Sequence, residues 1–153
     1  IDLSNGGTVL VYNQSFEQSR LEELMEIFPK YKDNLNTIKE HLFDLFKLVR
    51  SNSDLYHKQF NMDKEEAKIF NYYHPNQQGS FSIKKVLPLF SNLSYSDLNI
   101  QNGNEALIAY ATYHLYDKED LEDIYNDLIQ YCRQDTWAMV VILSGLRKLV
   151  NFI

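Results

Sequence analysis

The sequence has little of several features that usually reveal the class of a protein. Cys132 is its one cysteine, which excludes an internal disulfide and a CxxC metal knuckle and makes a reducing cytoplasm the expected location. No run approaches the roughly 18 apolar residues of a membrane-spanning helix, so we expect no membrane contact. The P-loop, GxGxxG, HExxH, GxSxG and EF-hand spacings are missing, so these common motifs indicate no cofactor.

Positive charge is also scarce. The chain has 15 Lys and Arg against 21 Asp and Glu, a formal net charge of -6. This balance excludes a basic coat of the histone type, because sequence-independent nucleic-acid binding relies on clustered Lys and Arg. It does not exclude an enzyme that meets phosphates through a bound metal, because the charge of an ion can outweigh the net charge of the protein.

The size of the chain suits one domain. Its 153 residues, 44% of them hydrophobic, are enough to form one core. No internal repeat, low-complexity tract or linker divides it, so residues 1–153 are interpreted as a single, partial domain. Because the chain begins at Ile1, close to a strand-like run, we expect it to be a piece of a longer protein.

Hydrophobic patterning predicts a helix-rich α/β chain. The run "TVLVY", Thr8 to Tyr12, follows two glycines and is typical of a buried strand. The next stretch, "NQSFEQSRLEELMEIF", changes to a period of 3.6, with Ser15 and Gln18 resembling a capping box and Pro29 ending the helix. Its predicted buried stripe is Leu21, Leu24, Met25 and Phe28. A strand followed at once by a helix indicates an α/β crossover unit.

The later segments are mostly predicted helices. "HLFDLFKLV", residues 41–49, fits a strand or a helix, and its periodicity does not decide between them. "YYHPNQQGS" is a predicted loop, after which Ser80 or Ser82 caps a short helix that stops near Pro88. "GNEALIAYATYHLY" is a helix by pattern. Residues 117–150 have acids early and bases late, as the helix dipole favours, and form one long helix or two joined near Cys132.

One acid interrupts the apolar stripe of this last segment. Asp135 has Tyr131, Cys132, Ala138 and Met139 three and four positions away, and no base within one turn on that face. An unpaired buried carboxylate costs several kcal/mol or takes up a proton, so it needs a partner. Asp135 is interpreted either as an incomplete N-cap of the residues after it or as a functional acid.

Glu17 is a second candidate. It lies in the first turn of its predicted helix, just past the carboxyl end of the predicted strand, where ligands gather in open α/β sheets. The alternative is an acid that faces solvent and stabilises the helix dipole. Asp44, in the ambiguous segment, is assigned to the fold rather than to a ligand site.

Several stretches resemble a known superfamily. "YNQSFE", with Asn13, Phe16 and Glu17, resembles the second motif, NxxFD, of the DnaQ-like (DEDD) 3'-5' exonucleases, and "YCRQD" matches the YxxxD motif of their tyrosine-type branch. The combination of "VYNQSFE", "HPNQQGSFSIKKVLP", "LSYSDLNIQNG" and "YCRQDTWAMV" is similar to an uncharacterised bacterial domain family of this superfamily. That likeness spans almost the whole chain.

The resemblance implies the C-terminal portion of an RNase H-like exonuclease fold, which acts on the single-stranded 3' end of a nucleic acid. Such enzymes use two divalent metals about 4 Å apart, and carboxylates suit Mg²⁺ or Mn²⁺. The implied metal ligands are Asp135 and Glu17. The implied catalytic residues are Tyr131, Asp135 and Glu17, and the implied substrate contacts are Asn13, Phe16 and His74. For His74, a structural role in its loop is the alternative.

Two departures from the family pattern shape the expectations. Glu17 stands where most members have Asp, and its extra methylene allows contact with the metal through water. The first motif, a DxE pair, is nowhere upstream of Glu17. We therefore expect this chain alone to be inactive and to bind Mg²⁺ or Mn²⁺ weakly. A non-catalytic nucleic-acid or protein binding module of the same fold is the alternative, and a plain helical interaction domain ranks last. The oligomeric state stays open.

Overall fold

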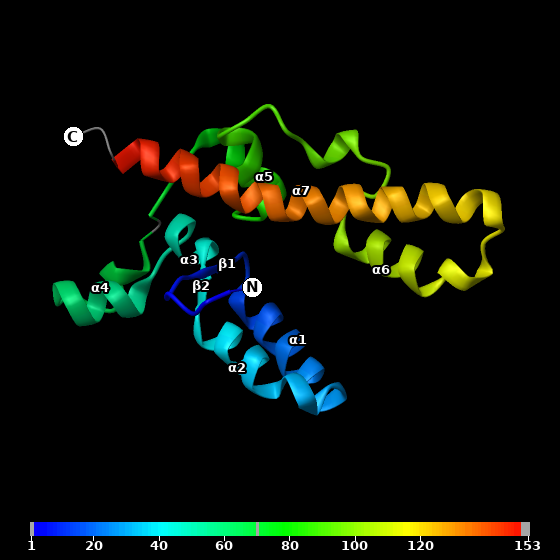
Figure 1. The fold of residues 1–153 in the computed structure, drawn as a ribbon. Helices are drawn as coiled ribbons and strands as arrows, with labels where there is room; N and C mark the ends of the chain where they lie inside the picture. The colour runs from blue at the N-terminus through cyan, green and yellow to red at the C-terminus, as the bar shows by residue number, and fades with distance from the viewer. Residues whose placement is uncertain (1, 70, 151–153) are drawn as a thin grey trace. The chain divides into compact units, whose positions relative to one another are not determined.

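The computed structural model describes residues 2–69 and 71–150, and its contacts divide the chain into two compact units, residues 1–81 and 82–153. Helices make up most of the chain, and two strands form a small parallel sheet (Figure 1). The expected helix-rich α/β class is therefore confirmed.

The first unit begins with a crossover between parallel strands. In chain order its elements are β1 (Val9–Val11), α1 (Gln14–Ile27), the 3-10 helix η1 (Pro29–Tyr31), α2 (Lys32–Glu40) and β2 (Leu42–Asp44). Val11 pairs with Asp44 at the carboxyl ends of the two strands. The strand predicted at Thr8 to Tyr12 and the crossover unit are thus confirmed, as is the end of the first helix before Pro29.

The start of α1 differs from the prediction. Its N-cap is Asn13, which has φ 91° in the left-handed region and whose side chain makes no capping bond. The predicted capping box of Ser15 and Gln18 is wrong, because Ser15 already lies inside the helix, where its Oγ donates to Asn13 Oδ1 at 2.8 Å. A short polar side chain such as that of Asn tolerates the left-handed conformation that turns the strand into the helix.

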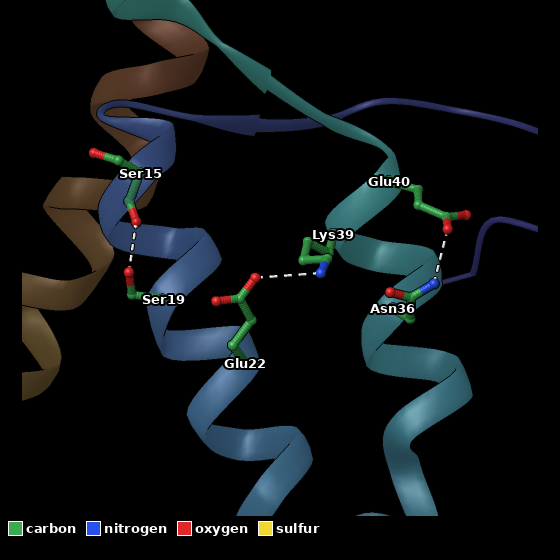
Figure 2. A network of polar contacts seen from close by, with 6 residues as sticks. All are labelled: Ser15, Ser19, Glu22, Asn36, Lys39 and Glu40. Atoms are coloured by element: carbon green, nitrogen blue, oxygen red, sulfur yellow. Dashed lines mark hydrogen bonds and ion pairs between the residues drawn. The ribbon is translucent and has the colours of Figure 1, made fainter.

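The apolar stripe of α1 is more exposed than expected. Leu24 is 39% exposed and Phe28 46%, and no residue of α1 itself is buried. α1 packs along α2 (Figure 1), and between the two helices Lys39 Nζ donates to Glu22 Oε1 at 3.3 Å (Figure 2). The hairpin is therefore a half-exposed layer rather than a core element.

Residues 41–49, for which a strand and a helix were both open, contain a strand followed by a helix. β2 ends at Asp44, and α3 (Leu45–Val49) begins at the next residue, with Leu45 and Val49 fully buried. The rest of the unit contains α4 (Ser53–Phe60) and the 3-10 helices η2 (Glu66–Lys68) and η3 (Pro75–Gln77). Tyr12 Oη donates to the Phe81 carbonyl oxygen at 2.6 Å and so ties the end of this unit to β1.

The second unit is organised by one long helix. Its elements are α5 (Ile83–Val86), η4 (Leu87–Leu89), η5 (Tyr95–Asp97), α6 (Gly103–Ala111), η6 (Tyr113–Leu115) and α7 (Lys118–Val150). α7 continues through Cys132 without a break, so the first of the two alternatives, one long helix, is confirmed. Of the two predicted caps, Ser82 occupies the N-cap position of α5, although its side chain makes no capping bond. No helix among the described residues is long and apolar enough to span a membrane.

Close packing on α7 fixes the core of this unit. Ala138 and Ile142 are fully buried, as are Val86 and Leu87 before them in the chain. At Gly145 a Cβ atom would lie 2.2 Å from Cδ1 of Phe90. The absence of a side chain there lets the Phe90 ring contact the helix backbone directly.

Candidate functional site

The predicted site residues fall into two groups, one in each unit. Asn13, Phe16, Glu17 and His74 belong to the first unit, and Tyr131 and Asp135 to the second. Each group is described on its own, and the joint metal site of Glu17 and Asp135 stays a prediction.

A pocket of about 610 Å³ opens where β1 and β2 end and α1 begins. It lies at the carboxyl edge of the sheet because the strands are parallel and Val11 pairs with Asp44. Asn13 lines it, together with Gln14, Ser15 and Gln18 of the first turns of α1. The edge of the sheet at which ligands were expected is therefore hollow, and most residues that line it are polar or charged.

Asp44 is the buried acid of this pocket, with 6% of its surface exposed. Its carboxylate accepts three backbone bonds, from the amides of Asn13 and Gln14 at 3.1 Å and of Phe46 at 3.0 Å. One side chain thus caps α3 and also binds the first amides of α1, where the helix dipoles favour negative charge. These bonds place Asp44 in the fold, as the sequence analysis assigned it.

Phe16 and Glu17 lie on α1 beyond the pocket. The Phe16 side chain is 57% exposed, and the Arg20 guanidinium lies 5.5 Å above its ring. Glu17 is half-buried in the first turn of the helix, the position that favours an acid by the helix dipole. Neither residue lines the pocket.

His74 has a structural role in its turn. It is the N-cap of η3, its Nδ1 accepts from the Asn76 amide at 3.2 Å, and its own amide donates to Gln77 Oε1 at 2.7 Å. Gln77 is 1% exposed, so this capping box is anchored in the core. The bonds support the structural alternative for His74.

Asp135 and Tyr131 lie one turn apart on α7, and both are half-buried. Because α7 is continuous, the interpretation of Asp135 as an N-cap is wrong. Its Oδ1 accepts a hydrogen bond from Tyr95 Oη at 2.6 Å, and the rings of Tyr95 and Tyr131 meet edge to face with centroids 6.2 Å apart. The protein partner of Asp135 is therefore a phenol hydroxyl.

Burial and the nearby carboxylate raise the pKa of both hydroxyls, so both stay protonated at a more alkaline pH than an ordinary tyrosine. Burial, and then the bond to Asp135, raises the pKa of Tyr95 far above its usual value. Burial, and then the charge of Asp135, raises the pKa of Tyr131 in the same direction. At neutral pH both residues are thus hydrogen-bond donors beside one carboxylate.

Sequence analysis missed Tyr95. It lies 40 residues before Asp135 in the chain, too far for helical spacing to join them. It does lie inside "LSYSDLNIQNG", one of the stretches that carried the family resemblance, and that was the available signal.

The described part of the chain contains no complete set of side chains that could hold a metal ion. Within residues 2–69 and 71–150 no three His, Cys, Asp or Glu side chains converge in a way that could hold an ion. Asp135 Oδ1 instead accepts the hydrogen bond from Tyr95 Oη. The described residues therefore do not fit Mg²⁺ or Mn²⁺ as a complete site.

Comparison with known proteins gives a family without an assigned activity. A family model described as "Domain of unknown function (DUF2779)" matches residues 1–82. The chain is 28% identical over 159 residues to "Uncharacterized protein UU173" of Ureaplasma parvum and 30% identical over 155 residues to "Uncharacterized protein MG366 homolog" of Mycoplasma pneumoniae. Each alignment covers 93% of this chain and 21% of the relative, so the chain spans about a fifth of these curated relatives. No solved structure matches.

Proposed function

The chain belongs to the DUF2779 family, and from this premise we propose that its parent protein hydrolyses nucleic acids from the 3' end as a metal-dependent exonuclease of the RNase H-like class. In this proposal the chain contributes Tyr131, Asp135 and Glu17, and a part of the longer protein outside residues 1–153 contributes the DxE acids. The substrate is a single-stranded 3' end, and the location is the cytoplasm.

The observation that carries the proposal is the setting of Asp135. It is a half-buried acid in the middle of a helix, it caps nothing, and it forms no ion pair with a base in the described part of the chain. The Tyr95 hydroxyl orients the carboxylate without cancelling its charge. A charge held in this way is suited to a cation that arrives with a partner or substrate.

The role of the chain's own residues is to orient rather than to complete a metal site. Since the described residues do not assemble one, no step is assigned to a metal here. Tyr131 keeps its proton at neutral pH, so its hydroxyl can donate to an attacking water or to a phosphate oxygen.

The test uses the full-length parent protein, a 5'-labelled single-stranded oligonucleotide, and Mg²⁺ or Mn²⁺. We expect a ladder of products shortened from the 3' end, and a loss of at least about 100-fold in rate with Asp135→Asn. Asp123→Asn is the matched control, because Asp123 is an exposed acid on the same helix. No ladder with either metal, or an Asp135→Asn protein as fast as the control, would contradict the proposal.

A non-catalytic binding module is the second candidate. The observation that favours it is that no complete set of metal ligands assembles in the described residues. It predicts that the parent protein binds the same labelled oligonucleotide and leaves it uncut. Asp135→Asn should change neither the binding nor the absence of cleavage.

A further inference from the structure

The pocket at the carboxyl edge of the sheet is cationic, although the chain as a whole is acidic. Lys47, Arg50 and Lys68 line it, and Asp44 is the one acid among its described lining residues. The Asp44 carboxylate is occupied by three backbone amides, so part of its charge is already offset. The surface that faces the pocket therefore has a positive excess in a chain of net charge -6.

Two of these cations have no acidic partner in the part of the chain that the structure describes. Lys47 Nζ donates to the neutral Gln14 Oε1 at 2.9 Å, and the Arg50 guanidinium lies 5.6 Å above the Phe46 ring. Lys68 pairs with Glu65 at 2.6 Å, but both side chains are largely exposed, so this pair is weak. Positive side chains that line one pocket repel one another, and a bound anion relieves that repulsion.

The backbone around Lys47 and Arg50 is held in place. Asn71 donates from its side chain to the Lys47 carbonyl oxygen and from its amide to the Arg50 carbonyl oxygen, each at 2.9 Å. The Tyr72 amide donates to the Val49 carbonyl oxygen at 3.0 Å. These bonds close the end of α3 and fix the two residues three positions apart beside the pocket, so that less entropy is lost when a ligand binds.

We propose that this pocket is an anion site that binds a phosphate group through Lys47 and Arg50, with the side-chain amide of Gln18 as a further donor. The planar guanidinium matches two phosphate oxygens, and the ammonium adds a point charge. About 610 Å³ lies within the usual range for small-molecule pockets, so a nucleotide unit has room. The phosphate can belong to a mononucleotide or to a polynucleotide backbone.

This inference goes beyond the proposed hydrolysis. It involves neither Asp135 nor a metal, so it stands even if the parent protein never cleaves a substrate. Binding is therefore measured in EDTA, where hydrolysis cannot occur and where failure of the exonuclease proposal has no effect.

The test is fluorescence anisotropy of a labelled single-stranded oligonucleotide titrated with the chain, with AMP and inorganic phosphate as competitors. We expect Lys47→Met/Arg50→Gln to weaken binding at least 10-fold and to reduce the salt dependence of log K by about 0.7 for each lost phosphate contact. Arg147→Gln/Lys148→Met is the matched control. It also removes one Arg and one Lys charge, but from α7 in the second unit, and should change binding little. Lys47→Arg/Arg50→Lys keeps both charges and should retain most of the affinity.

The outcomes separate the two sources of phosphate. Competition by AMP or inorganic phosphate indicates an isolated phosphate group, and binding of the oligonucleotide alone indicates a polynucleotide backbone. Either outcome supports the site if only the pocket variant loses binding while its circular dichroism stays that of the unmodified chain. The proposal is overturned if neither the oligonucleotide nor the small phosphates bind, or if the control variant loses as much affinity as the pocket variant.

Discussion

The two units differ in the donors that hydrogen-bond to their two key aspartates, Asp44 and Asp135. Asp44 of the first unit accepts three backbone amides, whereas Asp135 of the second accepts the hydroxyl of Tyr95. Backbone donors belong to the helices themselves, so Asp44 cannot change partner unless the helices α1 and α3 lose their caps. Tyr95 is only 4% exposed, but its hydroxyl is a single side-chain donor, so its loss uncaps no helix. Asp44 therefore belongs to the fold, whereas a functional role of Asp135 stays a prediction.

The largest expected effect is at Asp44. Asp44→Ala leaves three amides without their acceptor at two helix starts, and we expect a loss of about 3 kcal/mol in the free energy of unfolding, measured by urea denaturation with circular dichroism. The control is Asp33→Ala, which removes an exposed acid from the first turn of α2 and should change stability by less than about 0.5 kcal/mol. If both variants unfold alike, Asp44 is not structural and the comparison fails.

The next effect tests whether close packing on α7 stabilises the second unit, as we expect the bonds of Asp44 to stabilise the first. Gly145→Ala places a methyl group against the Phe90 ring, and the clash should outweigh the gain in helix propensity, with a net loss of about 2 kcal/mol. Gly103→Ala is the control, since the nearest atom to its Cβ would be the Tyr131 hydroxyl at 3.7 Å. Phe90→Leu should restore part of the stability of Gly145→Ala, and a Gly145→Ala chain as stable as the original would exclude the close contact.

A smaller effect concerns the bond between Tyr95 and Asp135. Tyr95→Phe removes one hydrogen bond to a carboxylate, at a cost of about 1.5 kcal/mol at neutral pH, measured in the same unfolding experiment. The control is Tyr125→Phe, which removes the hydroxyl of an exposed tyrosine on α7, the helix that carries Asp135. It should cost almost nothing.

The same variant sharpens the comparison through pH. Burial, followed by the bond to Asp135, raises the folded-state pKa of Tyr95 above its unfolded value of about 10. The stabilisation is therefore fully present below about pH 10 and is lost as pH rises through the folded pKa. Unfolding measured on either side of pH 10 should show a smaller alkaline loss in Tyr95→Phe than in Tyr125→Phe, and equal losses would mean that Tyr95 is not a protonated donor.

The smallest effect is at the surface of the α1 and α2 hairpin. Lys39→Met breaks the pair with Glu22, whose side chain is 58% exposed, so we expect a change below about 0.5 kcal/mol in urea denaturation. Glu22→Gln should give the same result. A loss as large as that of Asp44→Ala would show that the hairpin depends on its surface ions rather than on the buried carboxylate.

Local signals predicted much of the fold. The β-branched run before a 3.6-residue period gave β1 and α1, Pro29 ended that helix, and the order of acids and bases in residues 117–150 agreed with one helix. These features depend on neighbours in sequence. The same local view placed Tyr131 and Asp135 on one face, which α7 confirms.

Hydrogen bonds between residues far apart in the sequence could not be predicted. Asp44 bonds to Asn13 and Gln14, about 30 positions away, and Asp135 to Tyr95, 40 positions away, and no periodicity joins residues so far apart. The predicted capping box failed for the same reason, because a carboxylate from another element satisfies the first amides of α1. The predicted burial of the apolar stripe of α1 was wrong, because a periodic pattern shows which residues share a face of the helix and does not show whether another element covers that face.

The bonds of Asp44 also set how the first unit opens. They join residues 13 and 44 and so close the whole excursion through α1 and α2 at its base. We expect both helices to separate from the sheet only when this junction breaks. The α1 and α2 amides that lie inside helical hydrogen bonds should therefore exchange with solvent deuterium as one cooperative unit, with a common opening free energy, rather than fraying one turn at a time.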